Sequence, residues 1–113
     1  MRYEKLVKYY PDFANDKRFS KLDFILASRI QNLIDWDENM YDGFIGNPES
    51  IKSRFHLSNY STDEIANSLI HLLDLQVFEC KELSPKNNVK RFIFTPNQYY
   101  SPIQIDIETG ELL

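Results

Sequence analysis

Residues 47–75 constrain the fold most, because they predict two short helices joined by a tight turn. Asn47 is a favourable N-cap, and Pro48 stands at the first helical position, where its missing N–H costs nothing. A second helix start follows closely, since Ser61 as N-cap and Glu64 three residues later form a capping box. Two helices joined by a turn of three or four residues make a helix-turn-helix.

A longer helix is predicted upstream, over residues 21–35, with Ser20 as its cap and Asp23 in its first turn. Its apolar residues recur at helical spacing and form a broad stripe, which indicates a core helix: Leu22, Ile25, Leu26, Ile30, Leu33 and Ile34. Residues 40–45 then predict a short strand, punctuated by Gly43 and Gly46.

After residue 75 the hydrophobic period changes from helical to alternating. Residues 77–82 and 89–95 predict two strands, and the polar residues 84–88 between them predict a loop, so the two strands form a hairpin. Residues 103–107 alternate again and predict an extra strand, which adds to a sheet edge of this chain or of a second copy. The predicted fold is therefore α+β, a winged helix-turn-helix with a C-terminal strand.

At 113 residues the chain is expected to form a single domain. Its predicted parts are an N-terminal arm (1–20), a winged-helix core (21–95) and a C-terminal linker and strand (96–113). One cysteine excludes an internal disulfide and favours a reducing compartment. No apolar run approaches the roughly 20 residues of a membrane span, and no signal peptide is visible, so a cytoplasmic protein without membrane contact is expected.

Enzyme chemistry is not indicated. The acidic loop 35–39 lacks the glycine and glutamate of a calcium-binding EF-hand. His71 has no acid–base partner at a diagnostic spacing, and Cys80 is interpreted as a small core residue. Phosphate-loop, nucleophile-elbow and zinc-protease motifs are absent from the sequence. We therefore expect no catalytic residues, no metal and no cofactor.

Four stretches carry a family resemblance: residues 3–6, 18–22, 37–41 and 69–78. By their spacing and polarity, the chain resembles the amino-terminal winged-helix domain of the plasmid replication initiator protein A family, over residues 1–82. The resemblance implies a DNA-binding or initiator-assembly domain of a bacterial plasmid or phage, acting in replication initiation or its control. It also implies that helix 62–75 is the recognition helix.

Recognition helices place their first turns against base edges, and basic side chains supply the phosphate contacts. On helix 62–75 the residues expected to point outward include Asp63 and Glu64, together with Asn67, Ser68 and His71 as candidate DNA contacts. The basic candidates lie in the arm, the first helix of the pair and the hairpin: Lys17, Arg18, Lys52, Arg54, Lys81, Lys86, Lys90 and Arg91. They would bind double- or single-stranded DNA.

The charge distribution keeps a second hypothesis open. Residues 22–75 contain nine acidic and three basic side chains, and helix 62–75 has no lysine or arginine. Such an acidic segment favours a protein-interaction module that binds or inhibits a basic host protein, including a replication or nucleic-acid-handling protein. A homodimer formed through the C-terminal strand is compatible with either hypothesis.

Overall fold

The computed structural model describes residues 13–36 and 43–100. Within them a 3-10 turn, η1, precedes three α-helices and three β-strands in the order α2, β1, α3, α4, β2, β3. Their bounds are Phe13–Asn15 (η1), Lys21–Trp36 (α2), Phe44–Gly46 (β1), Pro48–Arg54 (α3), Thr62–Asp74 (α4), Phe78–Lys86 (β2) and Val89–Pro96 (β3). The α+β prediction is confirmed, and this order is compatible with a winged helix.

The helix pair begins where the local sequence predicts. The side chain of Asn47 accepts a hydrogen bond from the Ser50 N–H at 2.8 Å, and Pro48 opens α3. At α4, Ser61 accepts from the Glu64 N–H at 3.0 Å, and Glu64 accepts from the Ser61 N–H at 3.0 Å. Both capping boxes satisfy amides that have no partner within their helices.

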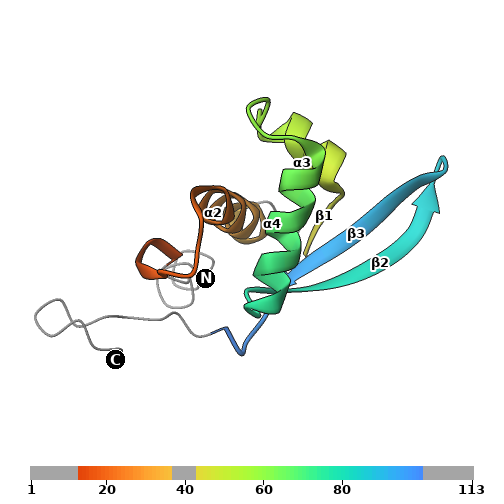
Figure 1. Ribbon diagram of the computed structural model, residues 1–113. Helices are drawn as coiled ribbons and strands as arrows, with labels where there is room; N and C mark the ends of the chain where they lie inside the picture. The colour runs from red at the N-terminus through yellow and green to blue at the C-terminus, as the bar shows by residue number, and fades with distance from the viewer. Residues whose placement is uncertain (1–12, 37–42, 101–113) are drawn as a thin grey trace, which may run out of the picture.

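The sheet is antiparallel in the order β1–β3–β2. Phe94 in the central strand pairs with Phe44 on one side and Cys80 on the other. Asn87 and Asn88 connect β2 to β3 with positive φ angles of 54° and 63°, as a type I′ hairpin turn requires. The β2–β3 hairpin extends away from the helices, on the side of α4 opposite to α2 (Figure 1).

The predicted loop over residues 84–88 is wrong, because β2 continues through Pro85 to Lys86 and only Asn87 and Asn88 form the turn. β2 is the outer strand of the described sheet, and an edge strand tolerates a proline that cannot donate a hydrogen bond. The register also shifts between Leu83 and Lys86, which is the irregularity expected of a bulge.

The core lies between α2, the helix pair and the root of the sheet. Every α-helix and all three strands contribute to it. The largest fully buried side chains are Leu26, Ile30, Phe44, Ile51, Ile65, Leu72 and Phe78, and Phe94 of β3 is 3% exposed. None of the helices described is long and apolar enough to cross a membrane. The first twelve residues of the predicted arm (1–20) lie outside the described residues, as does the whole predicted strand 103–107. The same holds for residues 37–39 of the acidic loop and 40–42 of the predicted strand 40–45.

Candidate nucleic-acid interface

The β2–β3 hairpin carries four of the predicted cationic contacts. Lys81, Lys86 and Lys90 are exposed, and Arg91 is half-buried. The Arg91 guanidinium donates to the backbone carbonyl of Ser84 across the hairpin, at 3.1 Å from Nε and 2.8 Å from the terminal nitrogen. This bond holds one positive charge against the ribbon and leaves the two lysines nearest the turn extended into solvent.

The hairpin tip, residues 83–91, contains Lys86, Lys90 and Arg91 and no acidic residue. The ion pairs recorded between described residues are Arg18 with Asp16 and His71 with Asp23, so the tip has no carboxylate partner within this part of the chain. Within the tip, the Asn47 side-chain amide at the start of α3 donates to the Lys90 carbonyl at 2.8 Å. The start of β3 is thus tied to the helix pair, while the lysine side chains remain exposed.

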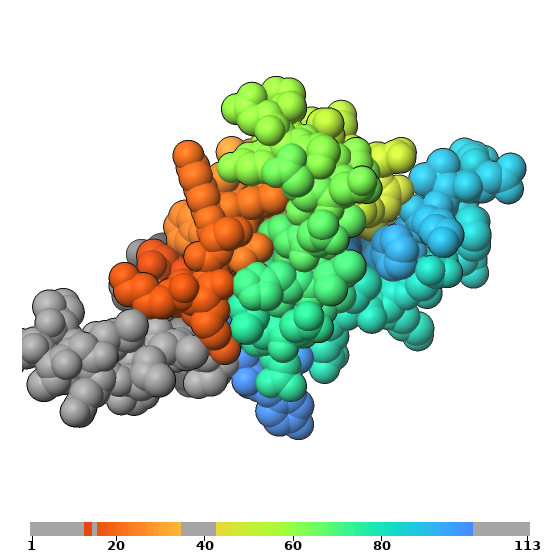
Figure 2. All heavy atoms as spheres, in the orientation of Figure 1, coloured from red at the N-terminus to blue at the C-terminus, as the bar shows by residue number. Residues whose placement is uncertain are grey.

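Helix α4 lies on the surface between α2 and the hairpin (Figure 2). Its exposed residues form one stripe at helical spacing: Asp63, Asn67, Ile70 and Asp74. Glu64 is exposed but is used in the capping box with Ser61. The stripe therefore presents two carboxylates, one amide and an isoleucine that is 55% exposed.

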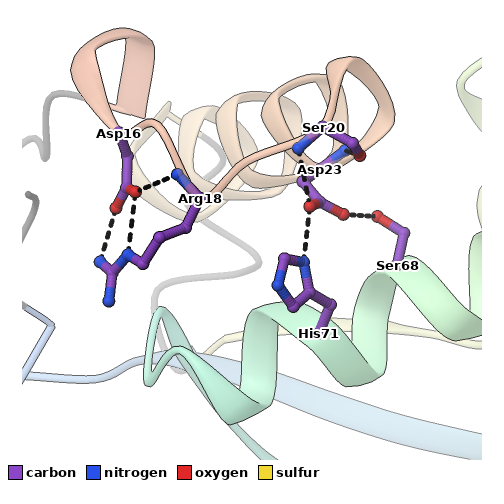
Figure 3. Close-up of polar contacts among 6 residues, drawn as sticks. All are labelled: Asp16, Arg18, Ser20, Asp23, Ser68 and His71. Carbon is purple, nitrogen blue, oxygen red and sulfur yellow. Dashed lines mark hydrogen bonds and ion pairs between the residues drawn. The ribbon is translucent and has the colours of Figure 1, made fainter.

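A buried polar cluster joins α4 to the start of α2 (Figure 3). Asp23 is 2% exposed and accepts three hydrogen bonds. They come from the Ser20 N–H at 2.9 Å, the Ser68 hydroxyl at 2.5 Å and the His71 Nδ1 at 2.6 Å. Ser20 in turn accepts from the Asp23 N–H at 3.1 Å, so Asp23 both caps α2 and anchors α4.

The hydrogen bonds decide the charge of Asp23. Burial acts to raise its pKa, but the bonds from Ser68, the Ser20 backbone and His71 together outweigh burial, and the pKa is lowered. A carboxylate with three donors is satisfied within the fold. The described residues include no group of three or more histidine, cysteine, aspartate or glutamate side chains placed to hold a metal ion.

The contacts of this cluster change which side chains of α4 are available to bind DNA. The expectation that Ser68 points outward is wrong, because Ser68 is 6% exposed and its hydroxyl faces α2. The Nδ1 of His71 is used by Asp23, while its side chain remains 43% exposed. Asn67 is exposed as predicted.

The interpretation of Cys80 on β2 as a core residue is also wrong, because Cys80 is exposed. Partial burial nevertheless raises the pKa of its thiol.

Arg18 belongs to a second polar cluster, which lies in the segment before α2 and apart from the Asp23 cluster (Figure 3). Its guanidinium pairs with both carboxylate oxygens of Asp16, at 2.9 and 2.6 Å, and the Tyr100 hydroxyl donates to the same carboxylate at 2.8 Å. Burial acts to raise the pKa of Asp16, but these bonds outweigh it and the pKa is lowered. The neighbouring Lys17 is exposed.

On α3, Lys52 is half-buried and Arg54 is exposed. The Arg54 guanidinium lies over the Phe44 ring, 5.6 Å from its centroid. The predicted contacts therefore stand on four separate parts of the fold: the segment before α2, α3, α4 and the hairpin. The hairpin holds the largest cationic group.

Arg29 is not among the predicted DNA contacts, but it lies near Arg54 beside Phe55. An arginine placed among the apolar residues of α2 was the sequence feature that could have indicated it.

Comparison of the chain with protein-family models, curated proteins and solved structures gives no match. The functional assignment therefore depends on the residues and geometry described above.

Proposed function

We propose that the protein is a non-enzymatic DNA-binding winged helix and that the hairpin tip supplies its main phosphate contacts. The observation that carries the proposal is the tip itself, with three cationic residues, no acid and exposed lysines on a projecting ribbon. A two-stranded ribbon fits a groove of duplex DNA, and affinity comes largely from neutralised phosphates.

The acidic stripe on α4 does not cancel this charge. The tip extends away from α4 (Figure 1), and salt screens the interaction between exposed charges more strongly as their separation grows. Asn67 is the exposed amide on α4 and would read adenine if the helix approached a major groove. The resemblance to plasmid replication initiators supports a role in replication initiation or its control in a mobile element.

The salt dependence of binding tests this proposal. Fluorescence anisotropy with duplex and single-stranded DNA should show affinity falling with salt, with about 0.9 in log–log slope per duplex phosphate contact and about 0.7 per single-strand contact. Lys86→Gln should reduce the slope by about one contact. Lys21→Gln removes an exposed charge at the start of α2 and should leave the slope unchanged. Equal effects from the two variants would exclude the tip.

A second function is favoured by a groove between α4 and the hairpin. The groove has a volume of about 210 Å³ and is lined by apolar groups, including Ala66, Leu69, Ile70 and Leu73 from α4 and Phe92 from β3. Its α4 side spans two helical turns, about 10 Å. On the helical side of the groove the exposed charges are mainly acidic, with Glu49 on α3 and Asp63 and Asp74 on α4, whereas β2 exposes both Lys81 and Glu82.

This combination suits an amphipathic helix of a protein partner, with an apolar anchor and lysine or arginine flanks. A synthetic helical peptide of that type should bind and should slow alkylation of Cys80, which lines the groove. A peptide with the same apolar residues and glutamate flanks is the matched control. If both peptides protect Cys80 equally, or neither does, the groove is not a docking site for a basic helix.

A further inference from the structure

A pocket between α2 and α3 brings two arginines together. Arg29 and Asn32 come from the middle of α2, and Arg54 comes from the end of α3. With Leu33 and Phe55 they line a space of about 310 Å³. No acidic residue is among these lining residues.

Both guanidinium groups are held on one pair of aromatic rings. Arg29 lies over Phe55 at 5.7 Å from its centroid, and Arg54 lies over Phe44 at 5.6 Å. The two rings are 5.8 Å apart, and they are only 1% and 5% exposed. Arg29 also donates to the Phe55 carbonyl at 2.7 Å. The two buried rings therefore form one platform that carries both guanidinium groups.

Most donors of these arginines remain unused. A guanidinium has five N–H donors, and the hydrogen bond recorded for Arg29 uses one nitrogen. Neither arginine is in an ion pair with a carboxylate of the described residues. Arg18, by contrast, donates hydrogen bonds to both carboxylate oxygens of Asp16. Two like charges that line one pocket, with no counter-charge among the described residues, favour an anion between them.

We propose that this pocket is a phosphate-group site in which Arg29 and Arg54 bind the oxygens and the Asn32 amide adds a donor. A phosphate group offers more acceptor oxygens and more charge than a carboxylate, which matches two guanidiniums and an amide. The phosphate belongs either to a nucleic-acid backbone or to a small phosphorylated molecule. The site is on α2 and α3 and does not depend on DNA binding by the hairpin tip.

Inorganic phosphate is the first probe. The arginine Nε–Hε resonances of the full-length ¹⁵N-labelled protein are followed while phosphate replaces chloride at constant ionic strength. Arg29 and Arg54 should shift together along one saturating curve, and Arg18 should not. Uniform shifts without saturation, or equal shifts with acetate, would mean that no phosphate site exists.

Two substitutions test the pair directly. Arg54→Gln and Arg29→Lys should each weaken phosphate binding about tenfold, the effect of losing one charge-assisted hydrogen bond. Lys21→Gln, at the start of α2 and outside the pocket, is the control and should leave the phosphate affinity unchanged. Thermal unfolding shows whether each variant is folded. If Arg29→Lys is not folded, the phosphate affinity of Arg54→Gln alone decides the test. Parent-like affinity in Arg54→Gln would overturn the proposal.

A short DNA duplex then distinguishes the two sources. Shifts of Arg29 and Arg54 on DNA addition, reversed by excess phosphate, would assign the site to a nucleic-acid backbone. Saturation by free phosphate with no response to DNA would assign it to a small phosphorylated molecule, even if the hairpin binds DNA. A lack of response to both would refute the site.

Discussion

Replacing Asp23 by alanine should be among the most damaging single changes to this fold. Asp23 is 2% exposed and accepts hydrogen bonds from Ser20, Ser68 and His71. The substitution removes the reciprocal cap of α2 and leaves the Ser68 hydroxyl and the His71 Nδ1–H without their acceptor. Leaving the buried Ser68 hydroxyl without an acceptor costs about 1–3 kcal/mol, and losing a helix cap costs about 0.5–2 kcal/mol. A chain of this length has about 6–17 kcal/mol in total.

Chemical denaturation followed by far-UV circular dichroism measures this loss. Glu79→Ala removes an exposed carboxylate and should change the free energy of unfolding by less than about 0.5 kcal/mol. Ser68→Ala and the Asp23→Ala/Ser68→Ala double variant complete a cycle, with an expected coupling of about 0.5–3 kcal/mol. A cost for Asp23→Ala below about 1 kcal/mol, or strictly additive effects, would refute the role given to this cluster.

The same cluster predicts a pH dependence. The folded pKa of Asp23 is lowered from 3.8, so its carboxylate contributes stability that is complete above the unfolded pKa and is lost as pH falls through the folded pKa. Stability should therefore decline below about pH 4, and less steeply in Asp23→Asn than in the parent. Identical acid profiles for the two proteins would contradict the lowered pKa.

Three further substitutions test the frame of the fold, each measured as a change in the free energy of unfolding. Gly43→Ala should destabilise by at least about 1–3 kcal/mol, because Gly43 has φ 144° and a Cβ there would lie 2.8 Å from Ile93 Cγ1; a neutral effect would refute the close approach. Asn88→Gly should be neutral or stabilise by up to about 1 kcal/mol, since φ is 63° in the I′ turn; a clear loss would argue against that turn. Asp16→Asn should destabilise by about 1–3 kcal/mol by weakening the Arg18 and Tyr100 contacts, and no change would leave that cluster without a structural role.

Local signals predicted the helix pair well. Asn47, Pro48, Ser61 and Glu64 act within one turn of their own helices, so their capping roles could be read without knowing the fold. The change of period after residue 75 likewise placed the hairpin. The end of β2 was misjudged because Pro85 disfavours strands in general, whereas an outer strand accepts it.

The polar cluster depends on contacts far apart in sequence. Ser68 stands three residues after Ile65 and four before Leu72, so its place on the buried face of α4 was open to inference. Its partner was not, because Asp23 lies 45 residues away and the pairing requires knowing how α2 packs on α4. The Arg29 and Arg54 pocket was missed for the same reason, since packing on Phe44 and Phe55 brings them together.

The most direct test of the central claim is a map of the amides that respond to DNA. Backbone ¹H–¹⁵N spectra of the full chain, recorded with and without a short duplex, locate the contact residue by residue. We predict the largest changes over the hairpin tip, residues 83–91, with a smaller change at Asn67. These changes should be lost in the triple variant Lys86→Gln/Lys90→Gln/Arg91→Gln. No change at the tip, or changes confined to other surfaces, would contradict the claim that DNA is held by the hairpin.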